Sequence, residues 1–161
     1  MWRKDVLYDI MDGKSAPLVS MLQQDPELAK WKCKQTGDEC MGFTLLHAAV
    51  RFNNAVALSL LLEHGAVNIL ARDKEGKTPF DWAIFNSEVT MVRTMLEAAS
   101  AGFAPQPNLK LALKSAEIQA EAAARSGTKA TEAKEVVALL VRLIEESERA
   151  MRAEAEAAAA A

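Results

Sequence analysis

One segment of about twenty residues occurs twice in this chain, and the repetition restricts the possible folds more than any other feature. Residues 42–62 read GFTLLHAAVRFNNAVALSLLL, and residues 76–96 read GKTPFDWAIFNSEVTMVRTML. Corresponding threonines, Thr44 and Thr78, lie 34 residues apart. In both copies apolar residues recur at helical spacing. A period of this length is typical of folds that stack one helical unit on the next.

The box at the start of each copy carries a family resemblance. Thr44-Leu45-Leu46-His47-Ala48-Ala49 differs at one residue from the T-P-L-H-x-A signature of ankyrin repeats. Thr78-Pro79-Phe80-Asp81-Trp82-Ala83 keeps the Thr and the Pro and replaces the Leu and the His. The chain therefore resembles ankyrin repeat proteins over about residues 3–104.

The resemblance implies an all-α solenoid of about three repeats. Residues 2–31 read as two short helices, and the second matches Asn53-Asn54 and the leucines that follow when shifted by 40 residues, so we expect a degenerate first repeat that lacks the box. Repeat two is expected over 39–72 and repeat three over 73–104. Residues 32–41 form an enlarged connection between repeats one and two.

A helical pair is predicted after the repeats. Pro105-Gln106-Pro107-Asn108 interrupts the array, and the composition then shifts to Ala, Glu and Lys. Helices are expected from Leu109 and from about Thr131. This pair is either a stretched fourth repeat that caps the array or an independent hairpin with a tail. We therefore predict an ankyrin repeat domain over 1–104 and an Ala/Glu-rich helical extension over 105–161.

Charge and composition exclude several classes of function. The net charge is -3, with basic residues scattered, so no nucleic-acid partner is expected. The longest uncharged apolar run, residues 55–62, is too short to cross a membrane. Two cysteines favour a reducing compartment. We expect a cytoplasmic protein, with a cytoskeletal or other large assembly and the nucleus as alternatives.

No catalytic or cofactor motif is present. The sequence contains no Gly-rich phosphate loop, no G-x-S-x-G and no H-E-x-x-H, so we expect no enzyme activity and no cofactor. Cys33 and Cys40 are too widely spaced for a zinc pair, so no metal is expected; they are free thiols or a redox disulfide. The resemblance implies a structural role for His47, which ties its helix to the neighbouring hairpin.

The resemblance also implies a partner-facing surface, built from the hairpin tips and the exposed side of each first helix. The corresponding residues are Cys40, Met41, Phe43, Arg51, Phe52, Lys74, Glu75, Lys77, Phe85 and Asn86. Phe43, Phe52 and Phe85 have the character of interface anchors. The alternative is that other parts of the chain fold over these phenylalanines. Trp82 is expected to pack against the next helix layer.

These patterns favour a non-enzymatic protein-interaction module: an adaptor or a structural subunit of a larger assembly. Its concave face would hold a protein segment. In the alternative, the C-terminal helix docks into the assembly and the repeats act as a spacer.

Overall fold

The structure is a computed structural model, and it describes residues 2–34, 40, 42–64, 68–102 and 105–160. Within these residues the secondary structure is helical, apart from one antiparallel bridge between Lys32 and Thr44. The α-helices are α1 (Trp2–Met11), α2 (Ala16–Gln24), α3 (Leu45–Arg51), α4 (Ala55–Glu63), α5 (Pro79–Phe85), α6 (Val89–Ser100), α7 (Leu109–Ser126) and α8 (Ala130–Ala160), and the 3-10 helix η1 spans Pro26–Lys30. The predicted all-α fold is confirmed.

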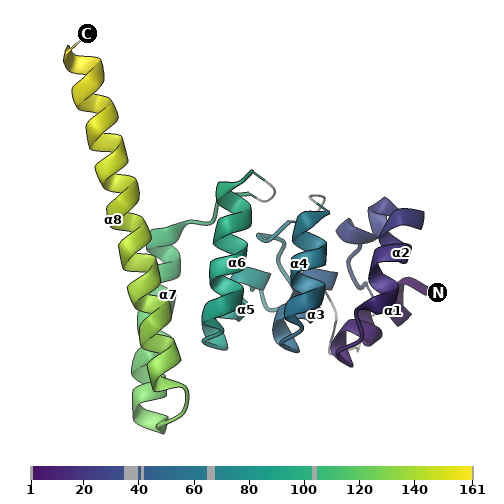
Figure 1. Cartoon of the computed structure of the whole chain (residues 1–161). Coiled ribbons are helices and arrows are strands. Elements are labelled where there is room, and N and C mark those ends of the chain that lie inside the picture. Colours follow the sequence, from purple (N-terminus) through teal and green to yellow (C-terminus); the bar gives the residue numbers. More distant parts are fainter. Residues whose placement is uncertain (1, 35–39, 41, 65–67, 103–104, 161) are drawn as a thin grey trace.

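The helices stack as consecutive antiparallel pairs in a single row from the N-terminus to the C-terminus (Figure 1). The first helices of the pairs contact one another in the order α1, α3, α5, α7. The second helices do the same in the order α2, α4, α6, α8. The molecule therefore has two helical layers, and each pair contacts mainly its neighbours along the row.

The Thr boxes start the first helices of the second and third pairs. Thr44 accepts a hydrogen bond from the backbone N–H of His47, and the His47 ring accepts one from the backbone N–H of Thr44. Thr78 and Asp81 exchange the equivalent two bonds at the start of α5. Each box satisfies backbone donors that a helix N-terminus leaves without partners. The two boxes use different side chains, His and Asp, for the same capping geometry.

The turns inside the second and third pairs also correspond. Asn53 and Ser87 both have positive φ, 54° and 57°. Asn54 then caps α4 by accepting from the backbone N–H of Ala57 at 3.0 Å. Its amide also donates to the backbone carbonyl of Ile10 at 3.2 Å. A single buried side chain thus starts a helix and joins the first pair to the second.

The core runs continuously through the row. Its largest fully buried side chains include Leu7, Ile10, Leu18, Leu28, Leu45, Leu46, Leu58, Leu61, Ile84, Met91 and Met95. These residues come from both layers of the first three pairs. The C-terminal pair joins the same core through Ala112, Ala116, Val136 and Leu140. Small residues on α7 and α8 allow these two long helices to approach each other and the third pair closely.

The enlarged connection between the first and second pairs is described at its two ends. The backbone N–H of Cys33 donates to the carbonyl of Phe43, and that of Gly42 donates to the carbonyl of Cys33, both at 2.8 Å. These bonds hold the two ends together as the base of a hairpin. The rest of the predicted enlargement, residues 35–39 and 41, lies outside the described residues.

The last part of α8 extends beyond the stack (Figure 1). Every described side chain from residue 149 to residue 160 is exposed. This segment remains helical through its composition, because Ala has the highest helix propensity. Ion pairs between Arg142 and Glu146 at 2.8 Å and between Glu145 and Arg149 at 3.4 Å support the turn before it.

Candidate protein-binding surface

The ten residues predicted to face a partner fall into three groups. Seven are exposed or half-buried: Arg51, Phe52, Lys74, Glu75, Lys77, Phe85 and Asn86. Among them, Phe52 at the end of α3 and Phe85 at the end of α5 are 41% and 47% exposed. Cys40 and Phe43 are buried, and Met41 lies outside the described residues.

The expectation that Cys40 and Phe43 are exposed was therefore wrong. Phe43 is 7% exposed, and its ring stacks on the His47 ring at a centroid distance of 5.4 Å. Cys40 is 3% exposed, with its Sγ 3.6 Å from the Sδ of Met11. The hairpin base brings both residues onto the helices of the first and second pairs. For Phe43 the alternative, internal cover, is the correct one.

Phe52 and Phe85 are the ends of a row of alternating aromatic and cationic side chains. The Arg51 guanidinium carbon lies 6.0 Å from the Phe52 ring centroid and 5.1 Å from that of Trp82. The Lys77 ammonium lies 4.2 Å from the Trp82 centroid and 4.4 Å from the Phe85 centroid. All four distances are within the range of cation–π attraction. We call Phe52, Arg51, Trp82, Lys77 and Phe85 the cation–aromatic row.

Trp82 lies at the centre of the row, and a buried hydrogen bond fixes the position of its ring. It is 6% exposed, and its indole N–H donates to Oδ2 of Asp73 at 2.7 Å. Its ring meets the Phe85 ring edge to face at 5.5 Å. Trp82 was expected to pack against the next helix layer; it is buried, and the contacts that define it here are with Arg51 of the preceding repeat and with Asp73 and Lys77 of its own hairpin. The alternation of Arg51, Trp82 and Lys77 across two repeats has no local sequence signal.

Asp73 holds the hairpin between the second and third pairs. Its Oδ1 accepts from the backbone N–H groups of Glu75 and Lys77 at 2.8 and 3.0 Å. Burial alone would raise the pKa of the Asp73 carboxyl. The N–H donors of Trp82, Lys77 and Glu75 outweigh burial and hold that pKa below its ordinary value of 3.8. Asp73 is therefore a charged acceptor that positions both Trp82 and the Lys77 backbone.

His47 joins the second helix pair to the same hairpin. Its Nδ1 accepts from the Thr44 backbone N–H at 3.1 Å, so its Nε2 carries the proton and donates to the Lys77 carbonyl at 3.1 Å. The side chain is fully buried. Burial is the largest influence on the His47 pKa and lowers it from 6.5. The structural role implied for His47 agrees with this geometry.

The neutral state of His47 predicts a pH dependence of stability. In the unfolded chain His47 takes up a proton near pH 6.5, whereas in the folded chain it does so only at lower pH. The contribution of neutral His47 to the free energy of unfolding is therefore complete above about pH 6.5 and declines as the pH falls toward the folded pKa. We expect the melting temperature to drop between about pH 7.5 and 5.5. It should drop less in His47→Gln, because Gln does not titrate and can still complete the capping box. Thermal melts followed by circular dichroism measure both. Equal drops in the two proteins would contradict the assignment.

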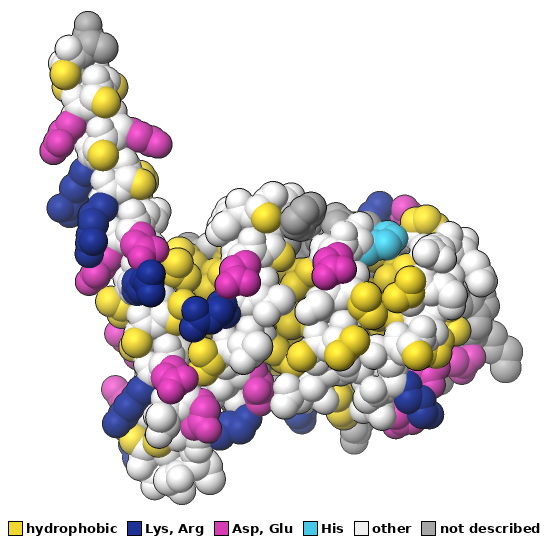
Figure 2. Space-filling model, viewed as in Figure 1, with side chains coloured by type: hydrophobic (Ala, Val, Ile, Leu, Met, Phe, Trp, Pro, Cys, Tyr) yellow, Lys and Arg dark blue, Asp and Glu magenta, His cyan; other side chains and the backbone are white. Residues whose placement is uncertain are grey.

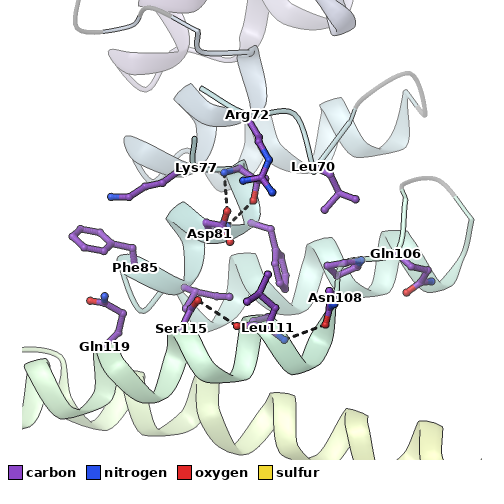
Figure 3. Close-up of a pocket in the computed structure, with 15 residues that line it drawn as sticks. Leu70, Arg72, Lys77, Asp81, Phe85, Gln106, Asn108, Leu111, Ser115 and Gln119 are labelled. Atoms are coloured by element: carbon purple, nitrogen blue, oxygen red, sulfur yellow. Dashed lines mark hydrogen bonds between the residues drawn. The ribbon is translucent and has the colours of Figure 1, made fainter. Parts of the chain in front are cut away.

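Beside the row, a groove runs between α5 and α7, with a volume of about 520 Å³ (Figure 3). Leu111 points from α7 toward α5, with Phe85 and Gln119 at one end of the groove and Leu70 and Gln106 at the other. Leu70, Phe85 and Leu111 are 37%, 47% and 59% exposed. Three large apolar side chains thus remain accessible along one groove, which we call the α5–α7 groove.

The polar residues of the α5–α7 groove are cationic on one side and neutral on the other. Arg72 and Lys77 come from the hairpin before α5, and Asp81 is the carboxylate among the described lining residues. Asp81 already accepts from the Thr78 backbone N–H. The α7 side contributes amide and hydroxyl groups from Gln106, Asn108, Ser115 and Gln119. The groove has no signal in the sequence, because α5 and α7 are brought together only by the stacking of the third and fourth pairs.

The described part of the chain was also searched for thiol pairs, metal-binding clusters and membrane-spanning helices. Cys33 and Cys40 are buried and are not joined by a disulfide. The described residues hold no cluster of three or more His, Cys, Asp or Glu side chains that could bind a metal ion. A search of the same residues found no helix with the length and hydropathy needed to cross a membrane.

Comparison with known proteins gives one finding. A family model described as ankyrin repeats (3 copies) matches residues 10–106. Neither the curated proteins nor the solved structures yielded a match. The matched segment begins within α1 and ends before α7, so it contains the box-bearing helices α3 and α5 and both ends of the cation–aromatic row.

Proposed function

Because the chain belongs to the ankyrin repeat family, a fold for protein–protein interaction rather than catalysis, we propose that it is an adaptor or assembly subunit that binds a protein on its cation–aromatic row. The observation that carries the proposal is the exposure of Phe52 and Phe85 where the first helices of two successive repeats end, joined through Arg51, Trp82 and Lys77.

The chemistry of the row supports a protein partner. Aromatic and Arg side chains contribute most of the binding energy at many protein interfaces. Here the row is held rigid before binding, since Asp73 fixes Trp82 and the two cations lie between rings. Little side-chain entropy is then lost when a partner covers the row. Lys74, Glu75 and Asn86 are accessible polar residues next to members of the row in the sequence or close to them, and Glu75 pairs with Lys77 at 3.5 Å.

The test is recovery of partners by affinity purification from the native source. Changing both Phe52 and Phe85 to Ala should reduce recovery of the specific partner by about tenfold or more, because both apolar anchors are lost. Val56→Ala on α4 is the matched control, since Val56 is 61% exposed but lies in the second-helix layer. Circular dichroism should be unchanged in both variants. If the double variant recovered the partner as well as the wild-type protein does, the cation–aromatic row would not be the binding site.

The alternative is docking through the C-terminal helix, and it is supported by the end of α8, which projects from the stack. The same purification distinguishes it when residues 149–161 are removed. This truncation leaves the fold intact, because the described residues it removes are all exposed. A cut nearer residue 131 would instead remove Ala133, Val136 and Leu140 from the core. Loss of partner in the truncated chain, with the double Phe variant unaffected, would favour the alternative.

We further propose that residues 105–161 cap the repeats. Support comes from the contacts of α7 with α5 and of α8 with α6, which repeat the arrangement of the earlier pairs. Lys129, before α8, also donates to the Asn86 carbonyl at 2.9 Å and pairs with Glu88 at 2.5 Å. These bonds join the turn of the last pair to the turn of the third.

A further inference from the structure

The α5–α7 groove presents apolar side chains beside cationic ones, of which Lys77 forms a partly exposed and therefore weak ion pair with Glu75 at 3.5 Å. Leu70, Phe85 and Leu111 are accessible along it. Among the described lining residues, Arg72 and Lys77 outnumber the single carboxylate of Asp81. Arg72 donates to the carbonyl of Gly76 and therefore retains its charge for another partner. An occupant of this groove needs an apolar stripe and a surplus of carboxylates.

The end of α8 has this composition. Residues 145–160, which we call the tail, contain Glu145, Glu146, Glu148, Glu154 and Glu156 against Arg149 and Arg152, so the tail carries a net charge of -3. Figure 2 shows the outer part of the tail standing clear of the rest of the molecule, with acidic, basic and apolar side chains along it, whereas Glu148 near its base pairs with Lys110 of α7 at 3.1 Å. The chain as a whole also has a net charge of -3, so the acidic surplus of the tail equals that of the entire protein.

One side of the tail continues an apolar stripe of α8. Ile144, Met151, Ala155 and Ala158 follow the i, i+7, i+11, i+14 spacing of a single helix face. Met151 is 58% exposed and has no core to pack against in its own chain. Glu148 and Glu154 flank this stripe. Amphipathic helices of this kind bind apolar grooves through such anchors.

The length of the tail agrees with the length of the groove. The tail spans about 24 Å at 1.5 Å per residue. The α5–α7 groove follows α7 from Asn108 to Gln119, and a second hollow lined by Gln119, Ala122, Ala123 and Lys129 continues it along the same helix. Together they follow most of the 18 residues of α7, about 27 Å.

The tail does not reach the groove of its own chain. α8 is one continuous helix of 31 residues, and its end points away from the stack (Figure 1). We propose that the tail of one copy docks in the α5–α7 groove of a second copy. Two chains can exchange tails and fill both grooves, or each can bind the next in a linear array. Lys77 and Phe85 belong to both surfaces, so this contact also covers one end of the cation–aromatic row.

The test uses purified full-length protein in sedimentation experiments over a concentration series. Association should be detected and should weaken at high salt, since opposite charges meet across the contact. Leu111→Glu in the groove and Met151→Glu in the tail should each weaken it by about tenfold or more, because each would bury a carboxylate among apolar groups. Both positions are more than half exposed, so both variants should fold. Val56→Glu on α4 is the matched control.

Mixing the two variants gives the decisive result. Leu111→Glu retains an intact tail and Met151→Glu an intact groove, so the mixture should associate more strongly than either variant alone. Three results would overturn the inference: a wild-type chain that stays monomeric, a Leu111→Glu chain that associates as well as wild type (pairing between tails), or a mixture that fails to associate. No outside partner takes part, so failure here is separate from failure of the proposed adaptor function.

Discussion

Gly42→Ala is expected to destabilise the protein by about 4 kcal/mol or more, the combined cost of a left-handed backbone and an unrelieved steric overlap. Gly42 has φ +85°, and a Cβ there would lie 2.6 Å from the backbone nitrogen of Lys74 and 3.0 Å from two backbone carbons of Asp73. No flexible side chain can move to relieve this overlap. The hairpin base before α3 and the hairpin before α5 would have to separate.

Gly76→Ala is the matched control for this prediction. Gly76 has φ +77°, but a Cβ there would meet nothing within 4 Å. Only the left-handed conformation is then penalised, at about 1–2 kcal/mol. Urea unfolding of both variants measures the two free energies. A Gly42 variant no less stable than the Gly76 variant would show that the two hairpins are not in close contact.

Asp73→Ala is expected to cost about 3–5 kcal/mol, because the buried carboxylate is the shared acceptor for three N–H groups. Removing it leaves the Trp82 indole and two backbone donors without their acceptor. The same change should weaken binding of a partner at the cation–aromatic row, since Trp82 loses the bond that fixes its ring. Denaturant unfolding and partner recovery therefore test one residue in two ways.

A double-mutant cycle isolates the bond to Trp82. Asp73→Asn retains a single acceptor oxygen. If that oxygen accepts from the backbone donors, the amide NH2 faces the indole N–H of Trp82; if the oxygen accepts from the indole, the NH2 faces the backbone donors. In the Trp82→Phe background this conflict of donors is absent, so Asp73→Asn should cost less there than in the wild-type chain. Equal costs in both backgrounds would contradict the shared-acceptor role of Asp73.

Several features were predictable from the sequence because their causes are local or periodic. The Thr44 and Thr78 boxes gave the helix starts, and the period between them gave the stacking. His47 was assigned a structural role from the family resemblance, and its ring bonds agree with that role. Ankyrin repeat membership, independently supported over residues 10–106, required no knowledge of tertiary contacts.

The binding surface was only partly predictable. Sequence position placed Phe43, Phe52 and Phe85 together as exposed anchors, but the hairpin base stacks Phe43 on His47, and Phe52 and Phe85 stay accessible. Exposure depends on which side chains the neighbouring repeat brings close, and the spacing within one repeat does not contain that information.

The sequence by itself therefore determined the repeat, its helices and their order, since these follow from capping bonds and apolar periodicity within about one repeat length. Only the tertiary structure decided where the surface is chemically distinctive. The cation–aromatic row combines Arg51 and Phe52 from one repeat with Lys77, Trp82 and Phe85 from the next. The α5–α7 groove likewise forms between helices separated in sequence, because stacking leaves some apolar side chains uncovered where two pairs meet.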